Sequence, residues 1–211
     1  MKTILCDLDG TLTDSGEGIM KCANLALSRY GLDVPDYHTL GVFVGPPLKD
    51  TFKNFHIPDE EIDNAIALFR QRYLTVGKFE NHPYEGIKDL LARLQSEGYK
   101  QCVATSKPEQ TAREILEHFD MTRYFDVICG ASYDHSREDK DAVIRYLLEQ
   151  TDAEDAVMIG DTKFDMIGAA KFNIPAIGVS WGFGSKEELI RYGAAKIVHT
   201  PAQLYQAILS M

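Results

Sequence analysis

Residues 2–13 read KTILCDLDGTLT, a short apolar run followed by two acids, a glycine and a threonine. The apolar run at residues 4–6 predicts a buried strand. Because side chains alternate along an extended chain, Asp7 and Asp9 are expected on the same side. Two carboxylates held that close repel each other unless a cation lies between them or one takes a proton. The stretch therefore predicts a site for Mg²⁺ and a reacting group, where Gly10 allows a sharp turn and a close ligand.

A calcium loop of the EF-hand type is an alternative for acids at this spacing. It requires acids or amides at loop positions 1, 3 and 5, glycine at 6 and glutamate at 12. Counted from Asp7, positions 5, 6 and 12 are Thr11, Leu12 and Gly18, so the alternative fails at all three. An ordinary turn with two solvated acids is a second alternative for this stretch. The motifs later in the chain argue against it.

A hydroxyl motif follows later in the chain. Thr105 and Ser106 lie at the end of a strand predicted at residues 100–105, ahead of a helix predicted at residues 109–118. A hydroxyl between a strand end and a helix start is suited to bind phosphate oxygens. Thr105 is also a candidate helix cap, and both interpretations fit the local sequence.

A lysine and a second pair of acids complete the set. Lys140 follows a predicted strand, and residues 160–165 read GDTKFD after another. Asp161 and Asp165 can complete a metal site, because Mg²⁺ prefers oxygen ligands. A crowded negative site also requires an ammonium group. Lys140 is preferred over its competitor Lys107 because of its position after the third strand of the body.

The four motifs resemble those of the haloacid dehalogenase-like hydrolases, most of which are Mg²⁺-dependent phosphatases. They are DLDGTLTD at residues 7–14, Thr105, Lys140 and GDTKFD at residues 160–165, in the family's order and spacing. The resemblance covers the whole chain and is nearest to the phosphoglycolate phosphatase-like branch. One departure is Asp141 after Lys140, where many members carry proline.

The resemblance implies a role for each acid. Asp7 is expected to attack phosphorus and form an aspartyl-phosphate, while Asp9 acts as general acid and base. Mg²⁺ is expected on Asp7, the Asp9 carbonyl and Asp161. Asp165 is expected either to bind the metal through water or to orient Lys140.

The resemblance also implies groups that hold the substrate. Thr105 and the Ser106 backbone are expected to bind phosphoryl oxygens, and Lys140 to neutralise them. A helical cap is expected to close over the site and select the substrate. Lys49, in the turn-rich loop at residues 45–49, is a candidate for meeting an anionic substrate; the alternative is a solvated lysine.

Strands that alternate with helices predict an α/β fold with a parallel, doubly wound sheet, Rossmann-like in kind. Ligands bind such sheets at the carboxyl ends of the strands, where the motifs are predicted to lie. Residues 15–80 carry helical patterns at residues 18–30, 48–55 and 59–75 and no strand signal. The predicted domains are therefore a catalytic core of residues 1–14 and 81–211 and a helical cap of residues 15–80.

Composition limits the partners and the compartment. The 211 residues carry a net charge of −10 and no basic cluster, which argues against a nucleic-acid surface. The four cysteines show no metal-binding spacing, and three lie in apolar runs, so we expect reduced thiols in the cytoplasm. No signal peptide or membrane-spanning run is visible. The sequence does not distinguish a monomer from a homodimer.

The expected function is Mg²⁺-dependent hydrolysis of a small phosphomonoester, phosphoglycolate phosphatase-like or 5′-nucleotidase-like. Sugar phosphates, pyrophosphate and phosphotyrosine stay open as substrates. A phosphomutase of the same family shares every core residue, and a receiver module that carries a phosphoaspartate is the alternative of another class. Trp181 either borders the site or anchors the packing, and His135 and Arg137 are expected in a solvated loop.

Overall fold

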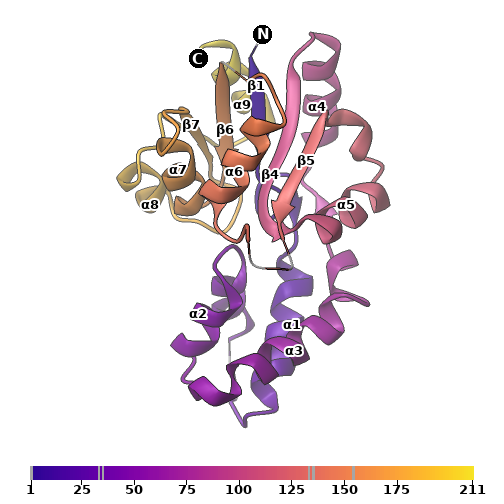
Figure 1. The fold of residues 1–211 in the computed structure, drawn as a ribbon, viewed down its shortest axis with the longest axis vertical. Helices are drawn as coiled ribbons and strands as arrows, with labels where there is room; N and C mark the ends of the chain where they lie inside the picture. Colours follow the sequence, from indigo (N-terminus) through magenta and orange to yellow (C-terminus); the bar gives the residue numbers. More distant parts are fainter. Residues whose placement is uncertain (1, 33, 35, 133, 135, 154) are drawn as a thin grey trace. The chain divides into compact units, whose positions relative to one another are not determined.

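The computed structural model describes residues 2–32, 34, 36–132, 134, 136–153 and 155–211. It divides into two compact units (Figure 1). The larger unit comprises Met1–Thr13 and Pro83–Met211 and is an α/β domain. The smaller unit, Asp14–His82, is helical. Within the described part of the chain, no helix is both long and apolar enough to cross a membrane.

A six-stranded parallel sheet forms the centre of the larger unit, in the order β5-β4-β1-β6-β7-β8. Its strands are β1 (Thr3–Cys6), β4 (Lys100–Pro108), β5 (Val127–Ala131), β6 (Ala156–Gly160), β7 (Ala176–Val179) and β8 (Lys196–Val198). In β1, Cys6 pairs with Val103 on one side and with Ile159 on the other. The strand order reverses at β1, which makes its carboxyl end the expected place for a ligand.

Helices cover both faces of the sheet. Ile4 and Cys6 pack into one apolar cluster, and Leu5 packs into the other. Helices α4 (Ile87–Ser96), α5 (Glu109–His118) and α9 (Pro201–Leu209) cover the first face; α6 (Lys140–Glu149), α7 (Lys163–Ala170) and α8 (Lys186–Arg191) cover the second. A short turn, η4 (Thr122–Tyr124), precedes β5. Strands that are buried on both faces appear in the sequence as continuous apolar runs. The predicted doubly wound α/β fold is confirmed.

The smaller unit contains α1 (Gly16–Ser28), α2 (Leu48–Asn54) and α3 (Ile62–Tyr73), where the sequence predicts helices. The 3₁₀ turns η1 (Tyr37–Phe43) and η2 (Asp59–Glu61) lie between these helices, and η3 (Gly77–Phe79) follows α3. The chain also forms two unpredicted short strands, β2 (Thr13–Asp14) and β3 (His82–Pro83), which pair with each other. Each of these strands contains a boundary between the two units.

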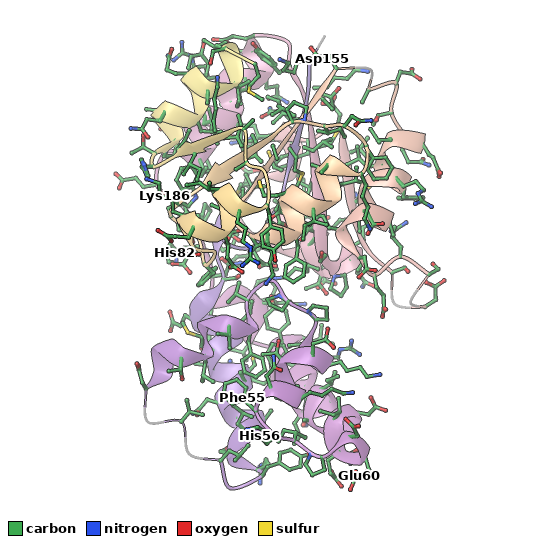
Figure 2. All side chains as sticks on the ribbon, turned by 90° about the vertical axis from the view of Figure 1, so that its left-hand side faces the viewer. Phe55, His56, Glu60, His82, Asp155 and Lys186 are labelled. Atoms are coloured by element: carbon green, nitrogen blue, oxygen red, sulfur yellow. The ribbon has the colours of Figure 1, made fainter. Side chains whose placement is uncertain are left out.

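The end of α2 shows how this unit turns its chain without a glycine. His56, which is labelled in Figure 2, follows the end of this helix. It has a left-handed φ of 61°. Its N–H donates to the Lys53 carbonyl (2.9 Å), and the next N–H, of Ile57, donates to the Phe52 carbonyl (3.3 Å). This is the Schellman arrangement, which satisfies the last carbonyl groups of a helix.

Glu80 connects α1 and α3 within the smaller unit. It accepts hydrogen bonds from Arg72 Nη1 (2.6 Å) and Nη2 (3.0 Å) and from Lys21 Nζ (2.9 Å). The bidentate Arg72 contact is the main reason why the pKa of Glu80 falls from 4.5 to about 2. The ionised carboxylate therefore stabilises the folded unit above about pH 4.5, and this stabilisation is lost as pH falls towards about 2.

Replacing Glu80 by glutamine should therefore destabilise the protein at neutral pH and matter little in acid. We expect a loss of about 1–2 kcal/mol at pH 7, because the lost hydrogen bonds are charged but partly exposed. Urea unfolding followed by circular dichroism at pH 7 and pH 3 measures the difference. Glu17→Gln, which removes a solvated partner of Lys21, is the control and should change little. An equal loss at both pH values would contradict the assignment to Glu80.

Candidate active site

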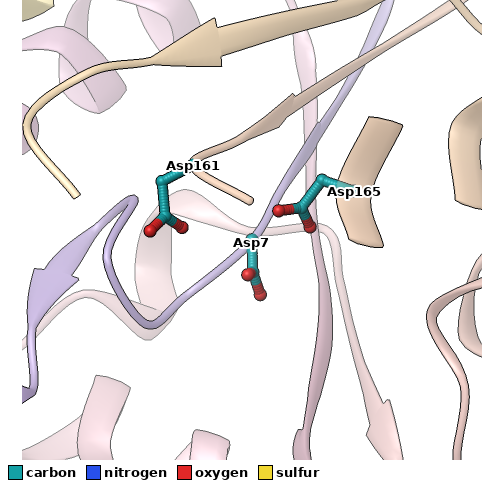
Figure 3. A group of neighbouring side chains, drawn as sticks. All are labelled: Asp7, Asp161 and Asp165. Atoms are coloured by element: carbon teal, nitrogen blue, oxygen red, sulfur yellow. The ribbon is translucent and has the colours of Figure 1, made fainter. Parts of the chain in front are cut away.

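The carboxyl ends of β1 and β6 bring three predicted acids together. Asp7 directly follows β1, and its N–H donates to the Ile159 carbonyl of β6 (2.9 Å), which continues the strand pairing. Asp161 follows β6, and Asp165 lies in the first turn of α7. One carboxylate oxygen from each of the three acids lies within 4.8 Å of the others (Figure 3). All three side chains are buried.

Hydrogen bonds fix the two later acids. Asp161 accepts from Thr11 Oγ1 at Oδ1 (3.1 Å) and from the Phe183 N–H at Oδ2 (2.8 Å). Asp165 forms a capping box with Thr162, whose N–H and Oγ1 donate to Asp165 Oδ2 (3.1 and 2.9 Å). The start of α7 therefore positions Asp165 through the same bonds that begin the helix.

Lys140, at the start of α6, lies among these acids. Its buried Nζ is 2.9 Å from Asp7 Oδ1 and 2.8 Å from Asp165 Oδ1, and it donates to the Ala104 carbonyl (2.8 Å). Burial alone would lower the pKa of Lys140, but Asp165 and Asp7 outweigh this and raise it. The lysine is therefore charged and balances only part of the negative charge around it.

The negative charge that Lys140 does not balance affects the pKa values of the acids. Burial raises the pKa of Asp7 to about 6, against the opposing effect of Lys140. Burial, together with repulsion from Asp165 and Asp7, raises the pKa of Asp161 well above its usual value. Three carboxylates that share one ammonium in a desolvated place form a site suited to a small divalent cation.

The second lysine of the site contacts a different acid. Lys107 Nζ lies 2.6 Å from Asp9 Oδ1, and both side chains are almost fully buried. Lys107 and Lys140 therefore both belong to the site, with separate partners. From the sequence, Lys107 was only an alternative to Lys140 for the role of the ammonium group in the site. Its spacing of two residues from Thr105 was the usable signal, because residues i and i+2 of a strand share a face.

Glycines allow the backbone to approach Asp161. Gly10 has a left-handed φ of 77°, and a Cβ atom built on it would lie 2.2 Å from Asp161 Oδ2. A Cβ atom on Gly182 would lie 2.3 Å from the same oxygen. Between these two glycine segments, Trp181 Nε1 donates to the Thr11 carbonyl (3.1 Å). Trp181 therefore anchors its loop to the turn after β1.

Thr105 lies on β4 and not at the cap of α5. Its Oγ1 accepts from the Lys107 N–H (3.2 Å), and the residue before α5 is Pro108. The strand predicted to end at Thr105 continues to Pro108, with a shift in its pairing with β5 after Ala104. Ser106 is partly exposed. Lys49 is exposed on α2 of the smaller unit.

The expectation that Arg137 is solvated is wrong. Its Nε donates to the Gly130 carbonyl (2.6 Å), its Nη2 contacts Glu109 Oε2 (2.8 Å), and its guanidinium lies 3.9 Å from the centre of the Tyr146 ring. These contacts hold the loop before Lys140 to the core. His135 lies outside the described residues.

Comparisons with known proteins identify a family and several similar proteins. A sequence profile described as haloacid dehalogenase-like hydrolase matches residues 4–179. A 5′-nucleotidase of Pseudomonas aeruginosa is 43% identical over 189 residues, which are 88% of this chain and 86% of that protein. The tyrosine-protein kinase PtkA of Mycobacterium tuberculosis is 38% identical over 93% of this chain and 68% of that protein. A solved structure of a predicted phosphatase from Clostridium acetobutylicum has a TM-score of 0.95 and 45% identity, covering 100% of this chain and 99% of that chain.

Proposed function

The chain belongs to the haloacid dehalogenase-like hydrolases and is a phosphatase, and we propose that it hydrolyses a small phosphomonoester with Mg²⁺ through an aspartyl-phosphate on Asp7. The family resemblance expected from the four motifs is thereby confirmed. One observation carries the proposal: Asp7, Asp161 and Asp165 are buried together around a single lysine. Such a group is costly to bury without a cation and is suited to hold one beside a nucleophile.

The donor set fits Mg²⁺. Its atoms are carboxylate oxygens, the hard ligands that this ion prefers. The combined negative charge of the three acids is greater than the single positive charge of Lys140. Asp7, Asp161 and the Asp9 carbonyl would hold the ion, while the contact of Asp165 with Lys140 favours an orienting role for Asp165. When bound, Mg²⁺ supplies neutralisation of charge on the transferring phosphoryl group.

Asp7 is oriented for attack by its own hydrogen bonds. Its Oδ1 accepts from the Leu8 N–H (2.8 Å) and lies 2.9 Å from Lys140 Nζ. Its Oδ2 takes no hydrogen bond from any residue that the structure describes, so we assign Oδ2 as the nucleophile. Formation of the Oδ2–P bond breaks the P–O bond of the ester, and Asp9 gives its proton to the leaving oxygen.

The second half of the reaction restores the enzyme. Asp9 takes a proton from a water molecule, the water attacks phosphorus, and the bond to Asp7 breaks to release inorganic phosphate. Lys140, Thr105 and the Ser106 backbone are proposed to hold the phosphoryl oxygens in both halves.

A nucleoside 5′-monophosphate is the first substrate we propose, because of the 43% identity to a 5′-nucleotidase. The smaller unit is proposed to act as a substrate-selecting cap, with Lys49 as a contact for an anionic group. Phosphate release from a panel with Mg²⁺ or with chelator tests this: nucleotides, phosphoglycolate, sugar phosphates, pyrophosphate and phosphotyrosine. We expect Mg²⁺-dependent release that is fastest from a nucleotide. No release from any compound, together with a trapped phosphoenzyme, would favour a phosphomutase.

Metal binding has a readout that does not depend on turnover. We expect Mg²⁺ to raise the thermal midpoint of the protein, because the ion reduces repulsion among the buried acids. At a concentration of about 100 Kd, the expected stabilisation is about 2.7 kcal/mol. Asp161→Asn should remove this shift. Asp155→Asn, at an exposed acid before β6 (Figure 2), should keep it. An unchanged shift in the Asp161 variant would place the ion elsewhere.

A further inference from the structure

Asp9, the group proposed above as acid and base, contacts a lysine of its own. Lys107 Nζ lies 2.6 Å from Asp9 Oδ1, and the two side chains are only 6% and 12% exposed. This ion pair is distinct from that of Lys140 with Asp7 and Asp165. The two lysines therefore contact different acids of the site.

Asp9 depends on Lys107 more than the other acids depend on any one partner. Asp161 accepts hydrogen bonds from Thr11 and Phe183, and Asp165 accepts two from Thr162. Among the residues that the structure describes, only Lys107 donates to the Asp9 carboxylate. The direction of that carboxylate is therefore set by one ammonium group.

Lys107 is itself held in a fixed segment. It lies where β4 shifts its pairing with β5, and its N–H donates to Thr105 Oγ1 (3.2 Å). A Cβ atom built on Gly130 of β5 would lie 2.5 Å from the Lys107 carbonyl oxygen. Close packing of the backbone thus fixes the base of the side chain, and a buried ammonium at its tip acts in a weakly screened place.

We propose that Lys107 is a positioning residue for Asp9, an inference that rests on the proposed function. It holds Oδ1 so that the other oxygen is presented to the leaving group. As the P–O bond breaks, the proton moves from Asp9 to the leaving oxygen, and the carboxylate left behind is stabilised by the Lys107 ammonium, which keeps its own protons. Preorganised charge of this kind stabilises the transition state without reorganisation.

The dependence on the leaving group provides the test. Lys107→Met keeps much of the side-chain volume and removes the charge. We measure kcat/KM with Mg²⁺ for 4-nitrophenyl phosphate, phenyl phosphate and alkyl phosphates. A leaving group as acidic as 4-nitrophenol needs little help from an acid, so its rate should change least. For alkyl esters we expect a loss within the roughly 10²–10⁴-fold that acid–base catalysis contributes, with little change in KM.

Two further variants make the result specific. Lys107→Arg should restore part of the alkyl ester activity, because it keeps a charged donor. Lys196→Met is the matched control. Lys196 begins β8, at the opposite end of that strand from its carboxyl end, and its Nζ donates to Ser210 Oγ (2.6 Å). This variant should retain wild-type rates with every ester.

A double variant distinguishes the positioning role of Lys107 from the proposed acid–base role of Asp9. If Lys107 acts through Asp9, Asp9→Asn combined with Lys107→Met should be no slower than Asp9→Asn alone. Equal loss for all leaving groups, a change in KM alone, or additive losses would overturn the positioning role. Wild-type activity of Asp9→Asn with alkyl esters would instead overturn the acid–base assignment of Asp9.

Discussion

Replacing Asp7 by asparagine is expected to abolish phosphate release and to make the metal-free protein more stable. The amide cannot form the phosphoenzyme, so turnover is expected to fall below detection. Stability should rise because one of three clustered carboxylates is removed. The pKa of Asp7 is raised from 3.8 to about 6, so its ionised form opposes folding; the cost grows between about pH 4 and 6 and is complete at pH 7.

The size of the gain follows from that shift. It corresponds to at most about 3 kcal/mol at pH 7, and the lost contact with Lys140 reduces it. For a chain of this length, each kcal/mol should raise the melting temperature by about 2–4 °C. Thermal scans in chelator at pH 7.5 and pH 4 measure it, and the two proteins should converge at pH 4. Intact mass spectrometry checks for the phosphoenzyme. Substantial turnover in this variant would refute Asp7 as nucleophile, and a lower melting temperature would refute the charge argument.

Lys140→Met should cost both activity and stability. The variant leaves Asp7 and Asp165 buried without their ammonium group and the Ala104 carbonyl without its donor. Removing one partner of a buried ion pair typically costs about 3–5 kcal/mol. In the wild type, the stem of the Lys140 side chain packs closely against Gly168. Methionine keeps an unbranched stem that can fill the same space. The loss should therefore reflect charge rather than an empty space.

A neighbouring ion pair provides the control for Lys140. Lys171 contacts Asp141 at 2.8 Å, but its side chain is 53% exposed. Lys171→Met should cost at most about 1 kcal/mol, as solvated pairs usually do. Chemical unfolding of both variants measures the contrast, and added Mg²⁺ should return part of the stability of Lys140→Met. Equal stability of the two variants would show that the buried cluster does not need its lysine.

The sequence predicted the body of the fold because both of its signals were local. Strands buried on two faces appear as apolar runs, and the motif residues follow those runs directly. A parallel sheet places all its carboxyl ends at one edge, so Asp7 and Asp161 had to converge once β6 paired with β1. Asp165 joined them because a helix begins between it and Asp161.

Contacts between side chains from distant segments could not be predicted in this way. The polar residues after Thr105 indicated the end of a strand, whereas β4 continues and carries Lys107 to Asp9. Arg137 looked like a surface residue because its partners, Glu109 and Tyr146, come from two other elements. Periodicity identifies the face on which a side chain lies, but not its partner on another element.

The central position of β1 also constrains the order in which the protein is made. Thr3 pairs with Lys100 on one side and Ala156 on the other, so the strand that precedes the proposed nucleophile emerges from the ribosome long before either neighbour. The helical unit Asp14–His82 is synthesised in this interval. The reactive end of β1 is completed only after β6 has been synthesised. Strand pairings between residues this distant along the chain favour slow folding. The candidate active site is therefore expected to form late in the folding of each new chain.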